Sequence, residues 1–302
     1  MLAAFIPSLA AVFMDPQQIT GVPAWLKPAK FAISSAVFTG SMAWLFGYIT
    51  VSPNWKRRLG SALSAAVTIE VTLIDFQAAR GVTSHFNVSS TENMVIWGMM
   101  ATWIGILLLS MIGVLILLGR QTFADAPWGW SLRLAMLITI LGAASGGLMT
   151  RPTASQYNAL AHHEAVSIVG GHTVGAPDGG PGITGLNWSK NHGDLRVPHF
   201  FGLHALQIVP LLFWVLRRRR RTRSKQRETR LAFATAGSYL GLVSLLIWQA
   251  LRGQAIDQPD ETTLAAFALW LGVSGIAMLW VNRAAARDQV KSNASTAAWN
   301  LF

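Results

Sequence analysis

The chain contains a series of apolar runs, each about as long as a membrane is thick. A helix needs about 20 apolar residues to cross a hydrocarbon core of about 30 Å, and runs of this length recur along nearly all of the 302 residues. Only 12% of the residues are charged and 52% are hydrophobic, whereas about a quarter of the residues in soluble domains are charged. We therefore expect an all-α integral membrane protein with little room for a separate soluble domain.

The apolar runs predict a bundle of seven transmembrane helices. The expected spans are residues 31–50, 60–79, 93–118, 130–149, 198–216, 231–251 and 263–281. Five segments follow: an interfacial or re-entrant N-terminal segment (1–30), transmembrane helices 1–4 (31–149), a long Gly-rich outer loop with a short helix (150–197), transmembrane helices 5–7 (198–283) and a tail (284–302). A loop this long is uncommon between helices unless it is functional or disordered.

Positive charges are shared unevenly between the two sides of the expected bundle. Seventeen of the 24 Lys and Arg residues fall on the side that holds the 1–2, 3–4 and 5–6 connections and the C-terminal tail. Cytoplasmic loops carry the excess of positive charge in membrane proteins, so we expect the N-terminus outside and the C-terminus in the cytoplasm. All seven histidines then fall on the outer side.

The longest run of positive charge, Arg217–Arg221, is interpreted as a topology signal that touches anionic lipid, in preference to a nucleic-acid site. The fourth span carries two pairs of small residues four apart, Gly142/Gly146 and Ala143/Gly147. Such pairs allow helices to approach closely. They predict a tight helix crossing, and they leave open a membrane-complex partner or a homo-oligomer.

A metal site in this chain must use histidine, carboxylate, methionine or backbone oxygen ligands, because the chain has no cysteine. His199 and His204 are five residues apart, about 140° around a helix, so an undistorted helix cannot point both at one ion. His204 and Gln207 share a face, and we expect His199, His204 and Gln207 to hold a cofactor with help from the loop. The metal-ligand candidates are His85, His163, His172, His192, His199 and His204. Their ligand types suit copper, iron or zinc, or a haem with an axial histidine; the opposing interpretation is a set of structural or solvated histidines.

Glu70 lies near the middle of the second expected span. A carboxyl group at this depth is energetically costly, and such residues usually face the bundle interior on a proton or substrate path. Asp75 and Gln77 follow toward the outer surface, which predicts a polar track about 10 Å long at 1.5 Å per residue. We expect Glu70, Asp75 and Gln77 to be catalytic, with a buried structural hydrogen-bond network as the alternative.

Two further charged groups lie on the outer side. Lys27 and Lys30 run against the charge bias, and they either extend toward lipid phosphates or pair with outer carboxylates or an anionic substrate. Asp194 and Arg196 are expected to form a local pair that shapes the turn into the fifth span.

Three functions are compatible with these residues. The favoured one is a metal- or haem-dependent redox protein with a His/carboxylate site at the outer face, acting on a lipid-soluble substrate such as a quinone. The second is a proton-coupled transporter or channel that uses Glu70 and Asp75. The third is a non-catalytic subunit or assembly factor of a membrane complex.

Three motifs give the chain a resemblance to known sequences. The segments PAWLKPAKFAIS, QAARGVTSHFN and GDLRVPHFFGLHALQ resemble a group of uncharacterised bacterial multi-pass membrane proteins, over about Asp15 to Pro210. The resemblance implies a protein of the bacterial inner membrane, with a periplasmic N-terminus. It brings no reaction, cofactor or catalytic residue with it.

Overall fold

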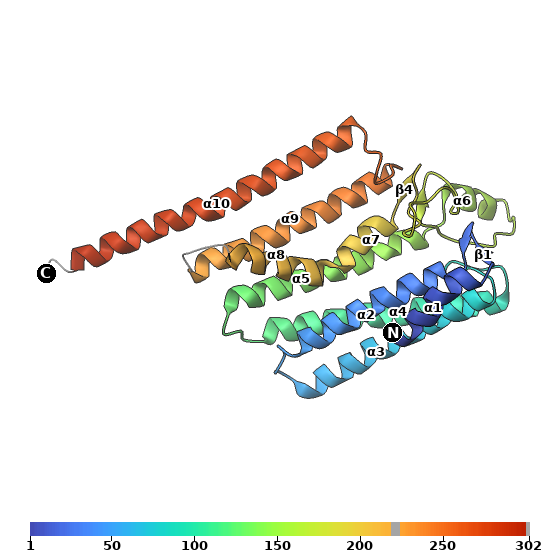
Figure 1. The fold of residues 1–302 in the computed structure, drawn as a ribbon, viewed down its shortest axis with the longest axis horizontal. Coiled ribbons are helices and arrows are strands. Elements are labelled where there is room, and N and C mark those ends of the chain that lie inside the picture. The colour runs from blue at the N-terminus through green and yellow to red at the C-terminus, as the bar shows by residue number, and fades with distance from the viewer. Residues whose placement is uncertain (219–223, 300–302) are drawn as a thin grey trace.

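A computed structural model describes residues 1–218 and 224–299 of the chain, with side chains up to residue 281. The described part is all-α apart from four two-residue strands (Figure 1). The helices are α1 (Leu2–Met14), α2 (Leu26–Phe46), α3 (Pro53–Ala79), α4 (Thr91–Arg120), α5 (Ala126–Ser145), α6 (Ala154–Ala161), α7 (Arg196–Leu203), α8 (Ala205–Arg218), α9 (Lys225–Leu251) and α10 (Glu261–Trp299). A short 3₁₀ helix (Gly146–Thr150) continues α5.

Six helices are long and apolar enough to cross a membrane: α2, α3, α4, α5 with its 3₁₀ extension, α9 and the first part of α10. A bent pair, α7 and α8, brings the number to seven if the pair is one span. The expectation of an all-α chain with several apolar spans is therefore confirmed. Helix α10 continues to Trp299 and includes much of the expected tail, whereas Arg219–Arg221 lie outside the described residues.

Helix α5 lies at the centre of the bundle, and α10 lies at its edge. Half of the apolar window of α5 is buried, against 6% for α10, and α10 packs mainly against α9 (Figure 1). The largest buried cluster joins side chains of α2, α3, α4, α5, α8 and α9. Since α10 presents large apolar side chains outward, among them Leu269 and Ile276, its outer face is compatible with contact to lipid.

A close contact between two glycines sets the crossing of α5 and α7. A Cβ atom on Gly142 would lie 2.3 Å from the carbonyl carbon of Gly202, far inside van der Waals contact. The tight crossing expected from Gly142 is confirmed. By contrast, a Cβ on Gly147 would meet nothing within 4 Å.

The expected fifth span is broken. Helices α7 and α8 meet at His204 with a bend of 55°, which frees backbone groups at the end of α7 from helical hydrogen bonding. The hydroxyl of Tyr239 on α9 donates to the carbonyl of Phe201 at 2.7 Å. One carbonyl at the break is thereby satisfied by a neighbouring helix.

The connections 15–25, 80–90, 146–195 and 252–260 gather at one end of the bundle, which we call the loop end (Figure 1). Strands β1 (Gln18–Ile19) and β2 (Val22–Pro23) form a small hairpin there, and β3 (Thr173–Val174) pairs with β4 (Gly193–Asp194). Helix α6 begins with a capping box in which Thr153 and Gln156 satisfy each other's backbone. The opposite end carries Arg217 and Arg218, and we call it the arginine end.

Candidate functional site

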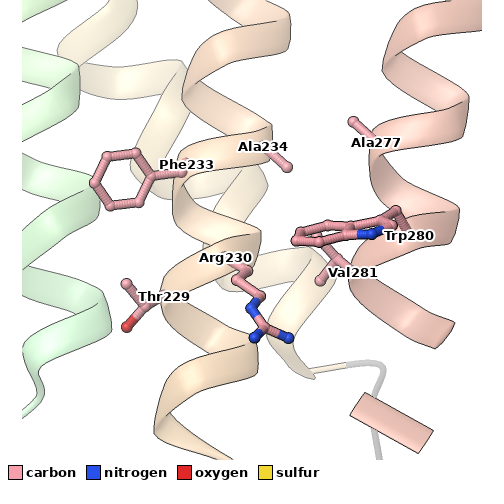
Figure 2. A pocket seen from close by; sticks show the side chains of 7 residues that line it. All are labelled: Thr229, Arg230, Phe233, Ala234, Ala277, Trp280 and Val281. Carbon is pink, nitrogen blue, oxygen red and sulfur yellow. The ribbon is translucent and has the colours of Figure 1, made fainter. Parts of the chain in front are cut away.

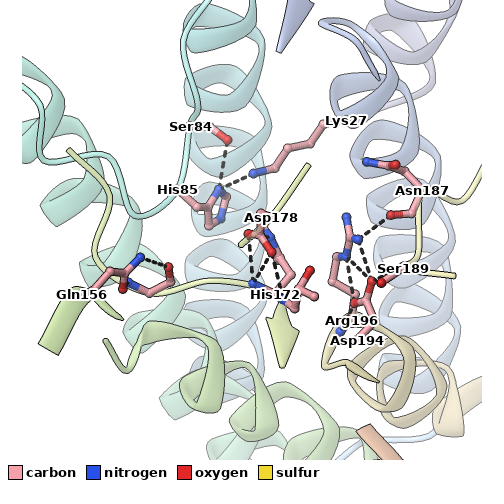
Figure 3. Close-up of polar contacts among 12 residues, drawn as sticks. Lys27, Ser84, His85, Gln156, His172, Asp178, Asn187, Ser189, Asp194 and Arg196 are labelled. Carbon is pink, nitrogen blue, oxygen red and sulfur yellow. Dashed lines mark hydrogen bonds and ion pairs between the residues drawn. The ribbon is translucent and has the colours of Figure 1, made fainter. Parts of the chain in front are cut away.

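Three titratable side chains are in line beneath the loop end. The Lys27 ammonium on α2 donates to His85 Nδ1 at 2.9 Å, and His85 Nε2 lies 3.0 Å from Glu70 Oε1 on α3. The Ser84 hydroxyl also lies 3.0 Å from His85 Nδ1 (Figure 3). Since an ammonium group only donates, Nδ1 accepts, and a neutral His85 ring carries its proton on the nitrogen that faces Glu70.

Glu70 is only 4% exposed. Its contact with His85 is short, but the N–H does not point squarely at the oxygen, so within the described part of the chain neither carboxylate oxygen has an aligned hydrogen bond. A buried carboxylate without hydrogen bonds is costly. The arrangement therefore favours a carboxyl group that exchanges a proton with its neighbour.

His85 is held neutral by its surroundings. Burial lowers its pKa well below the ordinary value of 6.5, and the nearby charges of Lys27, His172 and His199 lower it further. A neutral imidazole presents one donor and one acceptor at the same time. His85 is therefore in the form that can pass a proton from one side of the ring to the other.

Aromatic rings surround His85. The ring centres of Phe31, Phe86 and Trp97 lie 5.9, 5.9 and 5.4 Å from that of His85. Lys27 lies 5.7 Å from the centre of the Phe31 ring. These rings come from α2, α4 and the connection between α3 and α4, and they give His85 an aromatic environment.

The long loop covers this cluster through His172 and Asp178. Asp178 accepts from the backbone amides of His172 and Thr173 at 2.9–3.0 Å and contacts His172 Nδ1 at 2.7 Å (Figure 3). Burial raises the pKa of Asp178, but its hydrogen bonds to His172 and Thr173 and the charge of His172 outweigh that effect, so the net pKa lies well below the ordinary value. The pKa of His172 is lowered, chiefly by burial. The His172 ring packs against Phe86 with centres 5.3 Å apart.

Asp194 and Arg196 form the local pair expected from the sequence. The guanidinium of Arg196 donates to both carboxylate oxygens of Asp194 and to the carbonyl of Asn187. Asp194 is 2% exposed and also accepts from the Ser189 amide at 2.8 Å. The pair ties the loop to the start of α7, close to Lys30, whose ammonium donates to the Leu186 carbonyl at 2.7 Å.

His199 and His204 point to different partners. His199 Nδ1 donates to the carbonyl of Gly142 on α5 at 2.8 Å, whereas His204 Nδ1 contacts Gln207 Oε1 at 3.2 Å. The Gln207 amide donates to Ser41 on α2 at 2.8 Å. The expectation that one ion cannot be bound by both histidines agrees with these separate contacts, and Gln207 is connected to the first span.

The polar track expected on α3 is divided. Gln77 donates to Asn93 at 3.1 Å and accepts from Arg80 at 2.6 Å, in a network that also reaches Glu92 through Arg80. This network joins α3 to α4 and uses both ends of the Gln77 amide. Asp75 has one buried carboxylate oxygen without a hydrogen bond among the described residues. No contact in the described structure links either residue to Glu70.

The six histidines expected to bind metal are spread from the loop end to the break between α7 and α8. His85 and His172 both pack against Phe86, whereas His163 is exposed after α6 and has a positive φ of 58°. His192 lies in the turn before β4. Across residues 1–218 and 224–281, no three His, Asp or Glu side chains are grouped as they would be to hold a metal ion.

Three members of the cluster were not assigned to a site from the sequence. The sequence pattern gives no role to Ser84 or to Asp178, which stands among the glycines of the loop, and it marks Lys27 only as a cation for lipid phosphates, outer carboxylates or an anionic substrate. The sequence does indicate two of these residues by the segments that contain them. Lys27 lies in WLKPAKF, and Ser84 precedes His85 in RGVTSHFN. Both segments belong to the motifs that carry the resemblance.

A groove lies between α9 and α10 toward the arginine end (Figure 2). Its volume is about 300 Å³. The guanidinium of Arg230 on α9 lies 5.3 Å from the centre of the ring of Trp280 on α10. The remaining lining residues are Thr229, Phe233, Ala234, Ala277 and Val281.

Comparison of the chain with protein families, with curated proteins and with solved structures finds no match.

Proposed function

We propose that this chain is a proton-coupled membrane protein in which Lys27, His85 and Glu70 pass protons between the loop end and the middle of the bundle. The observation that carries the proposal is the line of contacts from the Lys27 ammonium through His85 to the Glu70 carboxylate, at 2.9 and 3.0 Å. An ionisable side chain inside a membrane span usually serves a proton or ion path. The proposal develops the transporter interpretation of Glu70.

The proposed step moves two protons together. Lys27 gives a proton to His85 Nδ1 while His85 Nε2 gives its proton to Glu70 Oε1. Lys27 and Glu70 become neutral and His85 stays neutral with its proton on the other nitrogen, so the total charge is unchanged. Release of the Glu70 proton toward the arginine end, reprotonation of Lys27 from the loop end and restoration of the His85 ring proton to Nε2 complete a transfer and return the three groups to their starting state. Aromatic rings pack against His85, and Glu70 is only 4% exposed.

The test is proton movement into liposomes that contain the purified protein and a pH-sensitive dye, driven by a potassium diffusion potential. We expect the wild type to exceed protein-free liposomes, and Glu70→Gln and His85→Gln to fall to that background. Glu164→Gln, which changes an exposed loop carboxylate, is the matched control and should behave as the wild type. A Glu70→Gln variant that moves protons at the wild-type rate, or a wild type equal to empty liposomes, would overturn the proposal.

A metal- or haem-dependent redox protein is the second candidate. His172 and His199 each hold Nδ1 against an oxygen acceptor, Asp178 and the Gly142 carbonyl, which leaves Nε2 as the nitrogen with a lone pair. Metal-binding histidines are oriented by second-shell acceptors in this manner. Binding of copper, iron, zinc or haem would require His85 or another ligand to move toward these two rings. Elemental analysis and an absorption spectrum of the purified protein test this candidate, and an absence of both metal and haem would remove it.

For location, we propose the bacterial inner membrane, with the loop end in the periplasm and the arginine end in the cytoplasm. The excess of Lys and Arg on one side supports this orientation. Anionic lipid is the proposed partner at the arginine end, where Arg218 lies 3.8 Å from the centre of the Trp214 ring and Arg230 borders the groove between α9 and α10. Interfacial tryptophan and arginine side chains commonly meet lipid head groups.

A further inference from the structure

A second polar cluster, formed by His204, Gln207 and Ser41, lies at the edge of the bundle, where the span formed by α7 and α8 bends. His204 is eight residues from the start of α7, a depth of about 12 Å at 1.5 Å per residue. The break of 55° falls at this residue. Interrupted helices are frequently the place where membrane proteins bind a substrate near the middle of the bilayer.

The hydrogen bonds of this cluster have a defined direction. The Ser41 hydroxyl donates to the Val37 carbonyl at 2.8 Å, so its oxygen accepts from the Gln207 amide nitrogen at 2.8 Å. Gln207 Oε1 is then an acceptor, and His204 Nδ1 donates to it at 3.2 Å. A neutral His204 therefore has no proton on Nε2, which is left as an acceptor.

The cluster borders the lipid-facing side of the bundle. Phe200 and Leu211 on the same face of the bent span are 41% and 58% exposed, and Val37 on α2 is 40% exposed. Helices α2 and α8 do not pack closely along their length, and the Gln207–Ser41 hydrogen bond bridges them. An acceptor nitrogen at this depth is costly unless a donor reaches it.

We propose that His204 binds the head group of a membrane-soluble quinol, with a quinol hydroxyl donating to His204 Nε2. The Phe200 ring, whose centre is 4.3 Å from that of His204, provides an aromatic wall beside the head group. A phospholipid fits less well, because its phosphate and ester oxygens are acceptors and its head group remains at the membrane surface. The proposal concerns binding alone and does not depend on the proton path through Lys27, His85 and Glu70.

The experiment compares two ligands that differ only in their donors, a short-tailed benzoquinol kept reduced and its dimethyl ether. Binding of each to the full-length protein in nanodiscs is measured against protein-free nanodiscs. Loss of a hydrogen-bond donor opposite a buried acceptor weakens binding by a factor of about 10 or more. We therefore expect the quinol to bind wild-type protein at least about 10-fold more tightly than the ether.

Replacement of His204 by Phe should remove this discrimination, so that the quinol and the ether bind alike. His163→Phe, at an exposed loop position, is the matched control and should keep the wild-type ratio. If His204→Phe fails to fold, Gln207→Leu provides the test. This variant keeps His204 but removes the acceptor that fixes the ring proton on Nδ1. The ratio of quinol affinity to ether affinity should then fall below that of the wild type. Equal binding of quinol and ether by the wild type, or an unchanged ratio in both variants, would overturn the proposal.

Discussion

Gly142 and Gly202 meet backbone to backbone where α5 crosses α7. The approach leaves no room for a side chain, because a Cβ on Gly202 would lie 2.4 Å from the Cα of Gly142. The carbonyl of Gly142 also accepts the hydrogen bond from His199 Nδ1. The crossing therefore fixes the depth of α7, and with it the position of His199 below the loop.

Gly142→Ala should destabilise the protein by about 1–3 kcal/mol, the usual cost of overpacking. Gly147→Ala, where a Cβ meets nothing within 4 Å, should remain within about 0.5 kcal/mol of the wild type. Thermal unfolding in detergent, followed by circular dichroism, measures both. Equal midpoints for the two variants would show that α5 and α7 can separate without cost.

Tyr239→Phe should destabilise the folded protein at the break between α7 and α8. The substitution keeps the ring but removes the donor to the Phe201 carbonyl, and a buried carbonyl without a partner costs about 1–3 kcal/mol. Tyr157→Phe, at a side chain that is 68% exposed, serves as the control. The thermal midpoint of Tyr239→Phe should fall below that of the control, and the expectation is wrong if the two coincide.

Stability should fall as the pH drops from 7 to 5. The pKa values of His85 and His172 are lower in the folded chain than the ordinary value of 6.5, so the unfolded chain binds more protons in this range. Their contribution is fully present above pH 6.5 and is lost as the pH falls from 6.5 toward the lower pKa values of the folded chain, by at most about 1.4 kcal/mol per pH unit for each histidine. His85→Gln should reduce the drop, measured as the difference between thermal midpoints at pH 7 and pH 5. An equal drop in this variant would contradict the burial of a neutral His85.

Asp178→Asn should loosen the loop over the cluster. The carboxylate accepts from two backbone amides and contacts the His172 ring, and its replacement by a neutral amide weakens all three interactions. Hydrogen exchange read by mass spectrometry should become faster in peptides that cover residues 172–178. Glu164→Gln should leave exchange in this segment unchanged, and exchange at the wild-type rate in Asp178→Asn would refute the role of the carboxylate.

Arg230→Gln should reduce the amount of anionic phospholipid that remains bound through purification. Arg58→Gln is a close control, because Arg58 also lies over a tryptophan, Trp55, at 5.5 Å from the ring centre. Native mass spectrometry should show fewer bound lipids for Arg230→Gln than for Arg58→Gln. Equal lipid content in the two variants would mean that the groove between α9 and α10 does not select anionic lipid.

The architecture was predictable from the sequence because long apolar runs have one stable arrangement in lipid, a helix. Ser90, a residue type that commonly caps helices, accepts from the Asn93 amide at the start of α4, and Gly142 does mark a tight crossing. The break at His204 was not predictable. No proline or glycine stands at that residue, and the donor to the Phe201 carbonyl beside the bend is Tyr239, which lies 35 residues further along the chain.

The candidate site was predictable only in its parts. The intramembrane position of Glu70 identified it as a functional candidate, and His85 was among the metal candidates. Their meeting could not be read from helical periodicity, because His85 lies on an irregular connection that returns into the bundle. Gln77 lies on the same helix as Glu70, α3, but has other partners. The amide faces Asn93 and Arg80 instead.

The proposed proton path comes from an early part of the chain. Lys27, Glu70 and His85, with the surrounding rings of Phe31 and Trp97, all precede residue 100. Membrane proteins are synthesised and inserted from the N-terminus, and early segments fold first. The three titratable groups can therefore meet once the first three spans have been inserted, and the long loop that covers them is added to a path that already exists.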